Sequence, residues 1–122
     1  MLPRKYRISN KDFIRAKEKG RKVFGPLFGL LIVQGKEESG DKAKFGFIVS
    51  KKIDKRAVIR NKIKRRLDQA LLSYLPKIKP GAKVVFLAKK ILVDKNFFEV
   101  QEEIGRMLRK AKLLQEVSTN EL

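Results

Sequence analysis

The sequence predicts an α+β fold, a two-layer α/β sandwich whose elements follow the order αβββαβα. Short apolar runs rich in β-branched and aromatic residues, at 27–33, 45–50 and 84–88, indicate strands because they are too short for free-standing helices. Two longer stretches repeat apolar residues at the helical period. With 122 residues, 43% of them hydrophobic, the chain can bury one modest core. We therefore expect a single domain over residues 1–112.

The chain opens with a short helix followed by an edge strand. Ser9 precedes Asp12 by three residues, an arrangement related to the capping box, so a helix is expected over 10–19. Gly20 is expected to end it. Residues 21–24 then predict a short edge strand.

Two apolar strands follow, joined by a charged segment. Residues 27–33 show no alternation, which indicates burial on both faces of the sheet. The segment 35–42 carries turn-forming residues and predicts a hairpin loop into the strand 45–50. Alternation in that strand gives a core face and a smaller-sided face suited to the floor of a groove. The two faces are Phe45, Phe47 and Val49, and Gly46, Ile48 and Ser50.

A long basic helix comes next, with Asp54 as its candidate N-cap. Its apolar residues fall within roughly a third of the circumference, so the helix should dock on the core by this stripe. The stripe comprises Ile59, Ile63, Leu67, Ala70, Leu71 and Tyr74. The opposite side carries Asn61, Lys64, Arg65 and Asp68, with Arg60 and Arg66 flanking the stripe.

The charge on this helix is unfavourable for the helix itself. Nine Lys or Arg and one acid lie between Lys51 and Arg66. Arg56, Arg60 and Lys64 are like charges at successive i,i+4 positions, each pair costing about 0.2 to 0.5 kcal/mol. The cations also crowd the N-terminal half, where the helix dipole favours acids. The pattern indicates an external polyanion; the alternative is a solvated Lys-rich face, which normally interleaves acids.

The last part of the chain predicts one more strand and one more helix. If strand 84–88 is a parallel neighbour of 45–50, the basic helix forms a βαβ connection. The final helix is expected over 94–112, with Asp94 as candidate N-cap and an order of acids then cations that suits its dipole. Residues 113–122 predict a frayed C-terminal tail. The apolar stripe of the final helix comprises Phe97, Val100, Ile104, Met107 and Leu108.

The composition narrows the class of protein. A formal net charge of +18 favours a polyphosphate partner, with an anionic membrane as the lesser alternative. No apolar run reaches the roughly 18 residues of a membrane span and no signal-peptide pattern opens the chain, so a cytoplasmic protein without a membrane partner is expected. The absence of cysteine and histidine excludes disulfides and thiolate metal sites and removes the commonest general base.

Catalytic patterns are missing from the sequence. There is no Gly-rich phosphate loop, no nucleophile beside a base, and no pair of carboxylates at a plausible spacing. We expect no catalytic residues and no metal ligands in this chain. From the residues alone, it is a basic nucleic-acid-binding domain that breaks no bonds itself.

The central stretch runs Val49-Ser50-Lys51-Lys52-Ile53, then Ala57, then Arg60-Asn61-x-x-Lys64-Arg65. This order resembles the signature of the bacterial ribonuclease P protein subunit. Weaker matches flank it and extend the resemblance to about residues 4–112. They are Tyr6-Arg7-Ile8 with Asp12-Phe13, and Ala88-Lys89-Lys90.

The resemblance implies a fold like that of ribosomal protein S5 domain 2, with a left-handed crossover that breaks the usual right-handed preference. It also implies a protein component of the endoribonuclease that matures tRNA 5′ ends. The basic helix face would bind the catalytic RNA subunit, and a cleft between the first helix and the sheet would hold the 5′ leader of precursor tRNA. The RNA would cut the phosphodiester with Mg²⁺ held mainly by RNA and substrate. No obligate protein partner is implied.

The resemblance also assigns site residues. Arg60, Asn61, Lys64 and Arg65 would carry the signature RNA contacts. The phosphate neighbours would be Lys51, Lys52, Lys62, Arg56 and Arg66. Asn61 has both a donor and an acceptor, which suits a base edge or a ribose hydroxyl; a backbone cap is the structural alternative.

For the leader cleft the resemblance gives a weaker set. Phe13 would be a cleft aromatic, although an ordinary core contact is the alternative, and Ile48 and Ala88 would lie near the groove floor. Further aromatics of the family appear here as Lys17, Leu31 and Leu114, and Asp68 stands where a second basic residue is common. Base stacking contributes about 1 to 3 kcal/mol per base. The leader is therefore expected to be held more by charge than by rings.

Two other classes fit the same charge. A ribosomal protein that supports rRNA would co-sediment with ribosomes and leave precursor cleavage unchanged. A DNA-binding protein would prefer duplex DNA to structured RNA, and an anionic-membrane protein would bind vesicles at physiological salt.

Overall fold

The computed structural model describes residues 2–34 and 42–115 of the chain. The observed order of elements is the predicted αβββαβα, so the α+β prediction is confirmed. The helices and strands are α1 (Asn10–Lys19), β1 (Arg21–Val23), β2 (Phe28–Gln34), β3 (Lys44–Ile48), α2 (Ala57–Leu72), β4 (Ala82–Ala88) and α3 (Phe97–Lys110). Short 3₁₀ turns lie at Arg4–Tyr6, Leu75–Lys77 and Lys90–Asp94.

The four strands form one sheet in the order β1-β2-β4-β3. β4 pairs antiparallel with β2 and parallel with β3, so the predicted βαβ connection through α2 is confirmed. The predicted hairpin between β2 and β3 is wrong, because β4 lies between them; most of its loop, 35–41, lies outside the described residues. Val84, Val85 and Phe86 are fully buried, and a strand buried on both faces is best satisfied at the centre of a sheet. The left-handed sense of the crossover stays a prediction.

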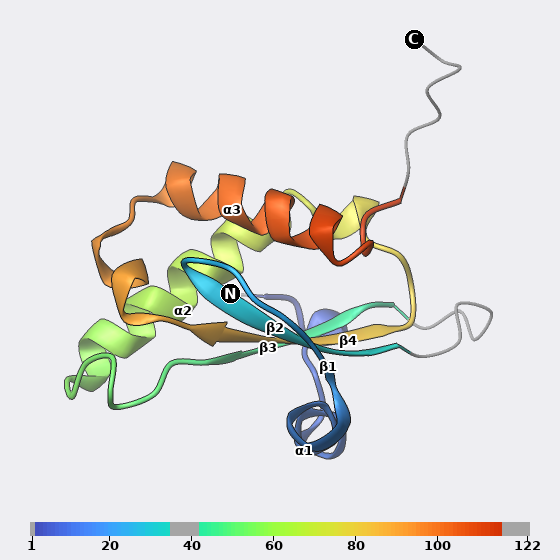
Figure 1. Cartoon of the computed structure of the whole chain (residues 1–122), viewed down its shortest axis with the longest axis horizontal. Coiled ribbons are helices and arrows are strands. Elements are labelled where there is room, and N and C mark those ends of the chain that lie inside the picture. Colours follow the sequence, from blue (N-terminus) through green and yellow to red (C-terminus); the bar gives the residue numbers. More distant parts are fainter. Residues whose placement is uncertain (1, 35–41, 116–122) are drawn as a thin grey trace, which may run out of the picture.

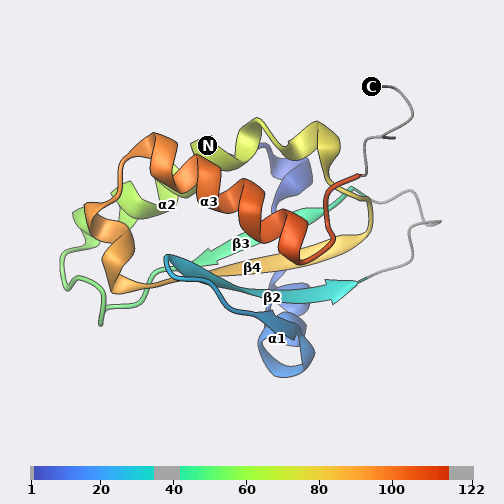
Figure 2. The same cartoon turned by 45° about the horizontal axis from the view of Figure 1, so that its top comes forward.

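Helices cover the two faces of the sheet unequally. Figures 1 and 2 show α2 and α3 together on one face and α1 alone on the other. The larger core lies under α2 and α3, where the Phe86 ring centroid is 5.1 Å from that of Phe28 and 5.3 Å from that of Phe47. The smaller core lies under α1 and contains Ala16, Leu31 and Val85. The sheet therefore has a deep face and a shallow face, and the shallow face carries the N-terminal helix.

The predicted ends of α1 are confirmed, whereas the predicted N-caps of α2 and α3 are wrong. In α1 the Ser9 hydroxyl accepts a hydrogen bond from the Asp12 N–H at 3.2 Å, and the helix ends before Gly20, as predicted. Asp54 is not the N-cap of α2, which begins after Arg56 without a side-chain cap. Asp94 is not the N-cap of α3 either; Asn96 caps that helix in a full capping box with Glu99. Only in α3 does a polar side chain nearer the first helical turn take over the capping role.

The predicted C-terminal tail, residues 113–122, begins too early in the sequence, because its first residues are docked on the fold. Lys112 adopts a left-handed conformation, with φ of 60°, which turns the chain back after α3. Leu113 is consequently fully buried, and its carbonyl accepts a hydrogen bond from the Lys79 N–H at 2.7 Å. The Gln115 N–H donates to the Lys77 carbonyl, also at 2.7 Å. Residues 113–115 are therefore docked, and 116–122 lie outside the described residues.

Candidate RNA interface

The segment between β3 and α2, residues 49–56, is here called the joint. Two of the predicted contact arginines, Arg56 and Arg60, hold it by hydrogen bonds. The Asp54 carboxylate accepts hydrogen bonds from the Arg56 backbone N–H at 2.9 Å, its Nε at 3.1 Å and its Nη2 at 3.0 Å. Arg60 Nη1 donates to the carbonyls of Asp54, at 3.0 Å, and Lys55, at 2.7 Å. Arg60 Nε and Nη2 make no hydrogen bond within the part of the chain that the structure describes. The joint thus uses one edge of Arg60 and leaves the rest of its guanidinium for a ligand.

The Asp54–Arg56 pair predicts a measurable pH dependence of stability. The side-chain hydrogen bond from Arg56 is the largest cause that lowers the pKa of Asp54 from 3.8 to about 2. A lowered folded-state pKa stabilises the fold above pH 3.8, and this contribution is lost as the pH falls towards about 2. We expect Asp54→Asn to lower the midpoint of urea unfolding at neutral pH, and the difference from wild type to shrink over that interval. A difference that is the same at every pH would contradict this role.

Most of the predicted RNA-contact cations lie exposed along α2 and the joint before it. The exposed residues are Lys51, Lys52, Arg56, Lys62, Lys64 and Arg65. Among the described residues, only Arg56 of this set forms an ion pair, with Asp54. Asn61 is also exposed and lies in the second turn of α2, which excludes an N-cap role for its side chain. Apart from Arg56, these exposed cations are therefore not paired with carboxylates of this part of the chain.

Arg66 differs from the other predicted contacts. Its side chain is half-buried, and Nη1 donates to the Lys95 carbonyl at 2.6 Å. Lys95 immediately follows the 3₁₀ turn that leads into α3. Arg66 therefore ties α2 to the start of α3, a structural partner that the sequence did not predict.

A cavity of about 620 Å³, here called the α2 groove, lies beside the cationic face. One wall is α2, with Asn61, Lys64, Arg65 and Asp68. The other wall is the N-terminal segment, with Leu2, Arg7 and Ile8. Phe13 of α1 and Phe45, Gly46 and Phe47 of β3 complete the lining. Three signature residues thus share one groove with the candidate cleft aromatic.

The N-terminal wall of this groove was missed by the sequence reasoning. The Ile8 N–H donates to the Phe45 carbonyl at 2.9 Å, and Arg7 bridges to Phe45 in parallel, so the segment extends the sheet beyond β3. Leu2 is almost fully buried in the larger core. A Cβ on Gly46 would lie 2.7 Å from Ile8 Cγ2, so glycine allows this close approach. The one available signal was the apolar pair at positions 2 and 8.

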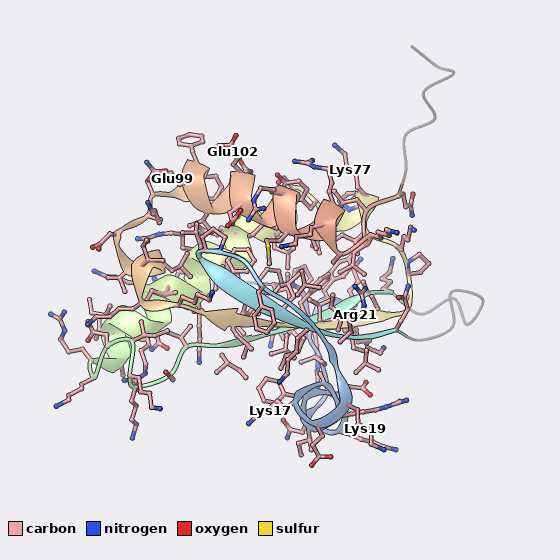
Figure 3. The ribbon with its side chains drawn as sticks, in the orientation of Figure 1. Lys17, Lys19, Arg21, Lys77, Glu99 and Glu102 are labelled. Carbon is pink, nitrogen blue, oxygen red and sulfur yellow. The ribbon has the colours of Figure 1, made fainter. Side chains whose placement is uncertain are left out.

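The predicted cleft residues divide between the two faces of the sheet. Phe13, Leu31 and Ile48 meet in the smaller core under α1, where Leu31 is buried and Phe13 and Ile48 are half-buried. Lys17 Nζ lies 5.8 Å from the Phe13 ring centroid, and Figure 3 shows Lys17 on α1. Ala88 packs against the larger core instead, so it does not join the other four. Phe13 is the one residue of the set that also lines the α2 groove.

The described residues include neither a cluster of metal-ligating side chains nor a membrane-spanning helix. Residues 2–34 and 42–115 contain no group of three or more Asp or Glu side chains placed to hold a metal ion. Over the same residues, no helix has the length and apolar character needed to cross a membrane.

Comparison with known proteins identifies the family. A family model described as Ribonuclease P matches residues 2–112. The chain belongs to the ribonuclease P protein family. The ribonuclease P protein component of Synechococcus sp. strain JA-2-3B'a(2-13) is 31% identical over 122 residues, which cover 98% of this chain and 90% of that protein. The ribonuclease P protein component of Alkaliphilus oremlandii is 31% identical and covers 86% of this chain and 89% of its own length.

Solved ribonuclease P proteins share the fold. The Staphylococcus aureus protein superposes with a TM-score of 0.77 at 29% identity, covering 90% of this chain and 98% of its own. The Thermotoga maritima protein has a TM-score of 0.73 at 23% identity and supports the fold alone. The family resemblance seen in the central signature is thus confirmed. Membership supports a role in tRNA 5′ processing and a partnership with the ribonuclease P RNA.

Proposed function

We propose that this chain binds the ribonuclease P RNA through the exposed cationic face of α2 and holds the 5′ leader of precursor tRNA in and beside the α2 groove. One observation carries the proposal. Asn61, Lys64 and Arg65, three residues of the family signature, line the same groove as Phe13. Phosphate-binding and base-contacting groups are therefore adjacent in the fold.

The cationic face supplies most of the affinity in this proposal. Each phosphate neutralised by Lys or Arg releases condensed counterions, so binding should weaken steeply with salt. Lys64 and Arg65 are exposed and free of ion pairs within the described residues. Arg60 keeps Nε and Nη2 available and can engage two phosphate oxygens with its planar fork, which Lys cannot do.

In this proposal, fewer aromatic side chains than cationic side chains hold the leader. Phe13 is half-buried and can stack one base, with Lys17 beside its ring. Leu31, at a position where an aromatic is expected from the family resemblance, is buried under α1 and out of reach of a ligand. Single-stranded RNA is then bound mainly through its backbone.

Bond breaking is assigned to the RNA. Magnesium, bound by RNA and substrate, would supply charge neutralisation at the phosphate. The described residues do not form a metal site of their own, so no ligand from this chain is proposed. The chain's contribution is to bind the two RNAs and orient one against the other.

The test is reconstitution. The protein is mixed with a bacterial ribonuclease P RNA and a precursor tRNA at a magnesium concentration where the RNA alone is slow, and leader release is followed on a gel. We expect the protein to increase the cleavage rate. No increase, together with co-sedimentation of the protein with ribosomes, would instead support a ribosomal role.

A further inference from the structure

Among the described residues that line the α2 groove, Asp68 is the only acidic one. It lies one helical turn after Lys64, on the same face of α2, at a Cβ separation of about 6 Å. A carboxylate repels phosphate, so an acid at this place opposes the function of its neighbours. Its presence needs an explanation beyond general RNA attraction.

The surroundings of Asp68 supply one backbone N–H donor, that of Leu2, and two positive charges, those of the N-terminal amino group and Arg7. Burial raises the pKa of this carboxyl, while a hydrogen bond from the Leu2 backbone N–H, the charge of the N-terminal amino group and the charge of Arg7 act in the opposite direction. A carboxylate has about four lone-pair sites on two oxygens, and the Leu2 N–H uses one of them. In a partly dry groove, further N–H donors would be bound more strongly than in water.

The rest of the groove fits a nucleobase. The rings of Phe13 and Phe47 are half-buried and lie on the lining, where a base can stack or pack against them. Lys64 and Arg65 stand beside this apolar surface and can hold a phosphate.

We propose that the α2 groove binds one unpaired guanine of an RNA ligand, with Lys64 and Arg65 on its phosphates and Asp68 accepting hydrogen bonds from its N1–H and N2–H. Guanine is the one standard base with two adjacent donors on its Watson–Crick edge. Adenine and cytosine present one donor beside an acceptor, and uracil presents one donor between two acceptors. This inference rests on the proposed RNA-binding function and adds a specificity-determining residue to it.

The first test uses the full chain and short RNAs. Pentanucleotides of uridine carrying guanine, adenine, cytosine, uracil or inosine at the centre are titrated by fluorescence anisotropy. We expect guanine to bind roughly tenfold more tightly than the other standard bases, as for a good bidentate contact, and inosine to lose most of this gain because it lacks the 2-amino group. Equal, salt-sensitive binding of all five would overturn the guanine site and leave the proposed function intact. Failure of all five to bind at low salt would count against both.

The second test changes Asp68, the residue proposed to contact the base. Asp68→Asn keeps an oxygen for the Leu2 N–H but offers one donor and one acceptor, a pattern that matches adenine. We expect this variant to prefer adenine to guanine, with an unchanged thermal unfolding midpoint. Asp94→Asn removes the same charge at an exposed position outside the groove and should keep the guanine preference. Retention of the guanine preference in Asp68→Asn would overturn the assignment.

A third measurement distinguishes two sources of the guanine, the catalytic RNA and the leader of precursor tRNA. In the first comparison, the affinities of wild type and Asp68→Asn for the ribonuclease P RNA alone are measured. In the second comparison, each protein is first assembled with that RNA, and its affinity is then measured for precursor tRNA with and without replacement of the leader guanines by inosine. A several-fold loss confined to the first comparison assigns the guanine to the catalytic RNA. A loss confined to the second assigns it to the leader. No loss in either would overturn the site in the assembled enzyme.

Discussion

Replacing Lys64 and Arg65 together with alanine is expected to lower the affinity for the ribonuclease P RNA by roughly tenfold per contact at 0.1 M salt. The same double variant should reduce the slope of log affinity against log salt by about 1.4 to 1.8, because each lost phosphate contact removes about 0.7 to 0.9. Both side chains are exposed, so the fold should be unaffected. The measurement is a filter-binding or anisotropy titration at several salt concentrations.

The control for this variant removes two charges elsewhere. Lys90→Ala with Arg109→Ala gives the same change in net charge, at exposed residues of the 3₁₀ turn and of α3. These residues do not line the α2 groove. An equal loss of affinity in both double variants would show that net charge alone, and not the α2 face, attracts the RNA. Circular dichroism should show the same helical signal in all three proteins.

The second large effect concerns the packing of α2 itself. Leu67→Ala is expected to lower the free energy of unfolding by about 2 to 5 kcal/mol, since Leu67 has no exposed surface and its truncation leaves a cavity between the helix and the core. A small domain has only about 5 to 15 kcal/mol in total. Urea unfolding followed by circular dichroism measures the loss.

The same helix provides a matched control. Leu72→Ala deletes the same atoms from a side chain that is 39% exposed, and should cost less than about 1 kcal/mol. RNA affinity per folded molecule should be unchanged in both variants, because neither leucine lines the groove. A weaker affinity in fully folded Leu67→Ala would mean that the helix position, and not only its stability, depends on this residue.

The local features of this protein were predictable from its sequence. The strand character of 27–33, the helix after Ser9 and the apolar stripe of α2 all depend on residue type and spacing within about a dozen residues. The stripe prediction is confirmed by the burial of Ile63, Leu67 and Leu71. The excess of cations between Lys51 and Arg66 is likewise a property of the sequence alone. The central signature was enough to suggest the family.

Features that depend on distant segments were not predictable in this way. The sequence does not show that β4 enters between β2 and β3, because that choice depends on which strand gains most from burial on both faces. It also does not show that Arg66 is bound by the Lys95 carbonyl while Lys64 and Arg65 stay exposed, since these side chains are chemically alike. The buried Leu113 shows the same limit at the C-terminal end.

The sequence by itself determined the elements of this protein and the sign and position of its charge, because both follow from local periodicity and composition. The tertiary structure alone decided that the N-terminal segment closes a groove against α2, with Asp68 inside it. The physical reason is that the groove depends on burial of Leu2 and on a hydrogen bond from Ile8 to Phe45, contacts between segments far apart in the chain.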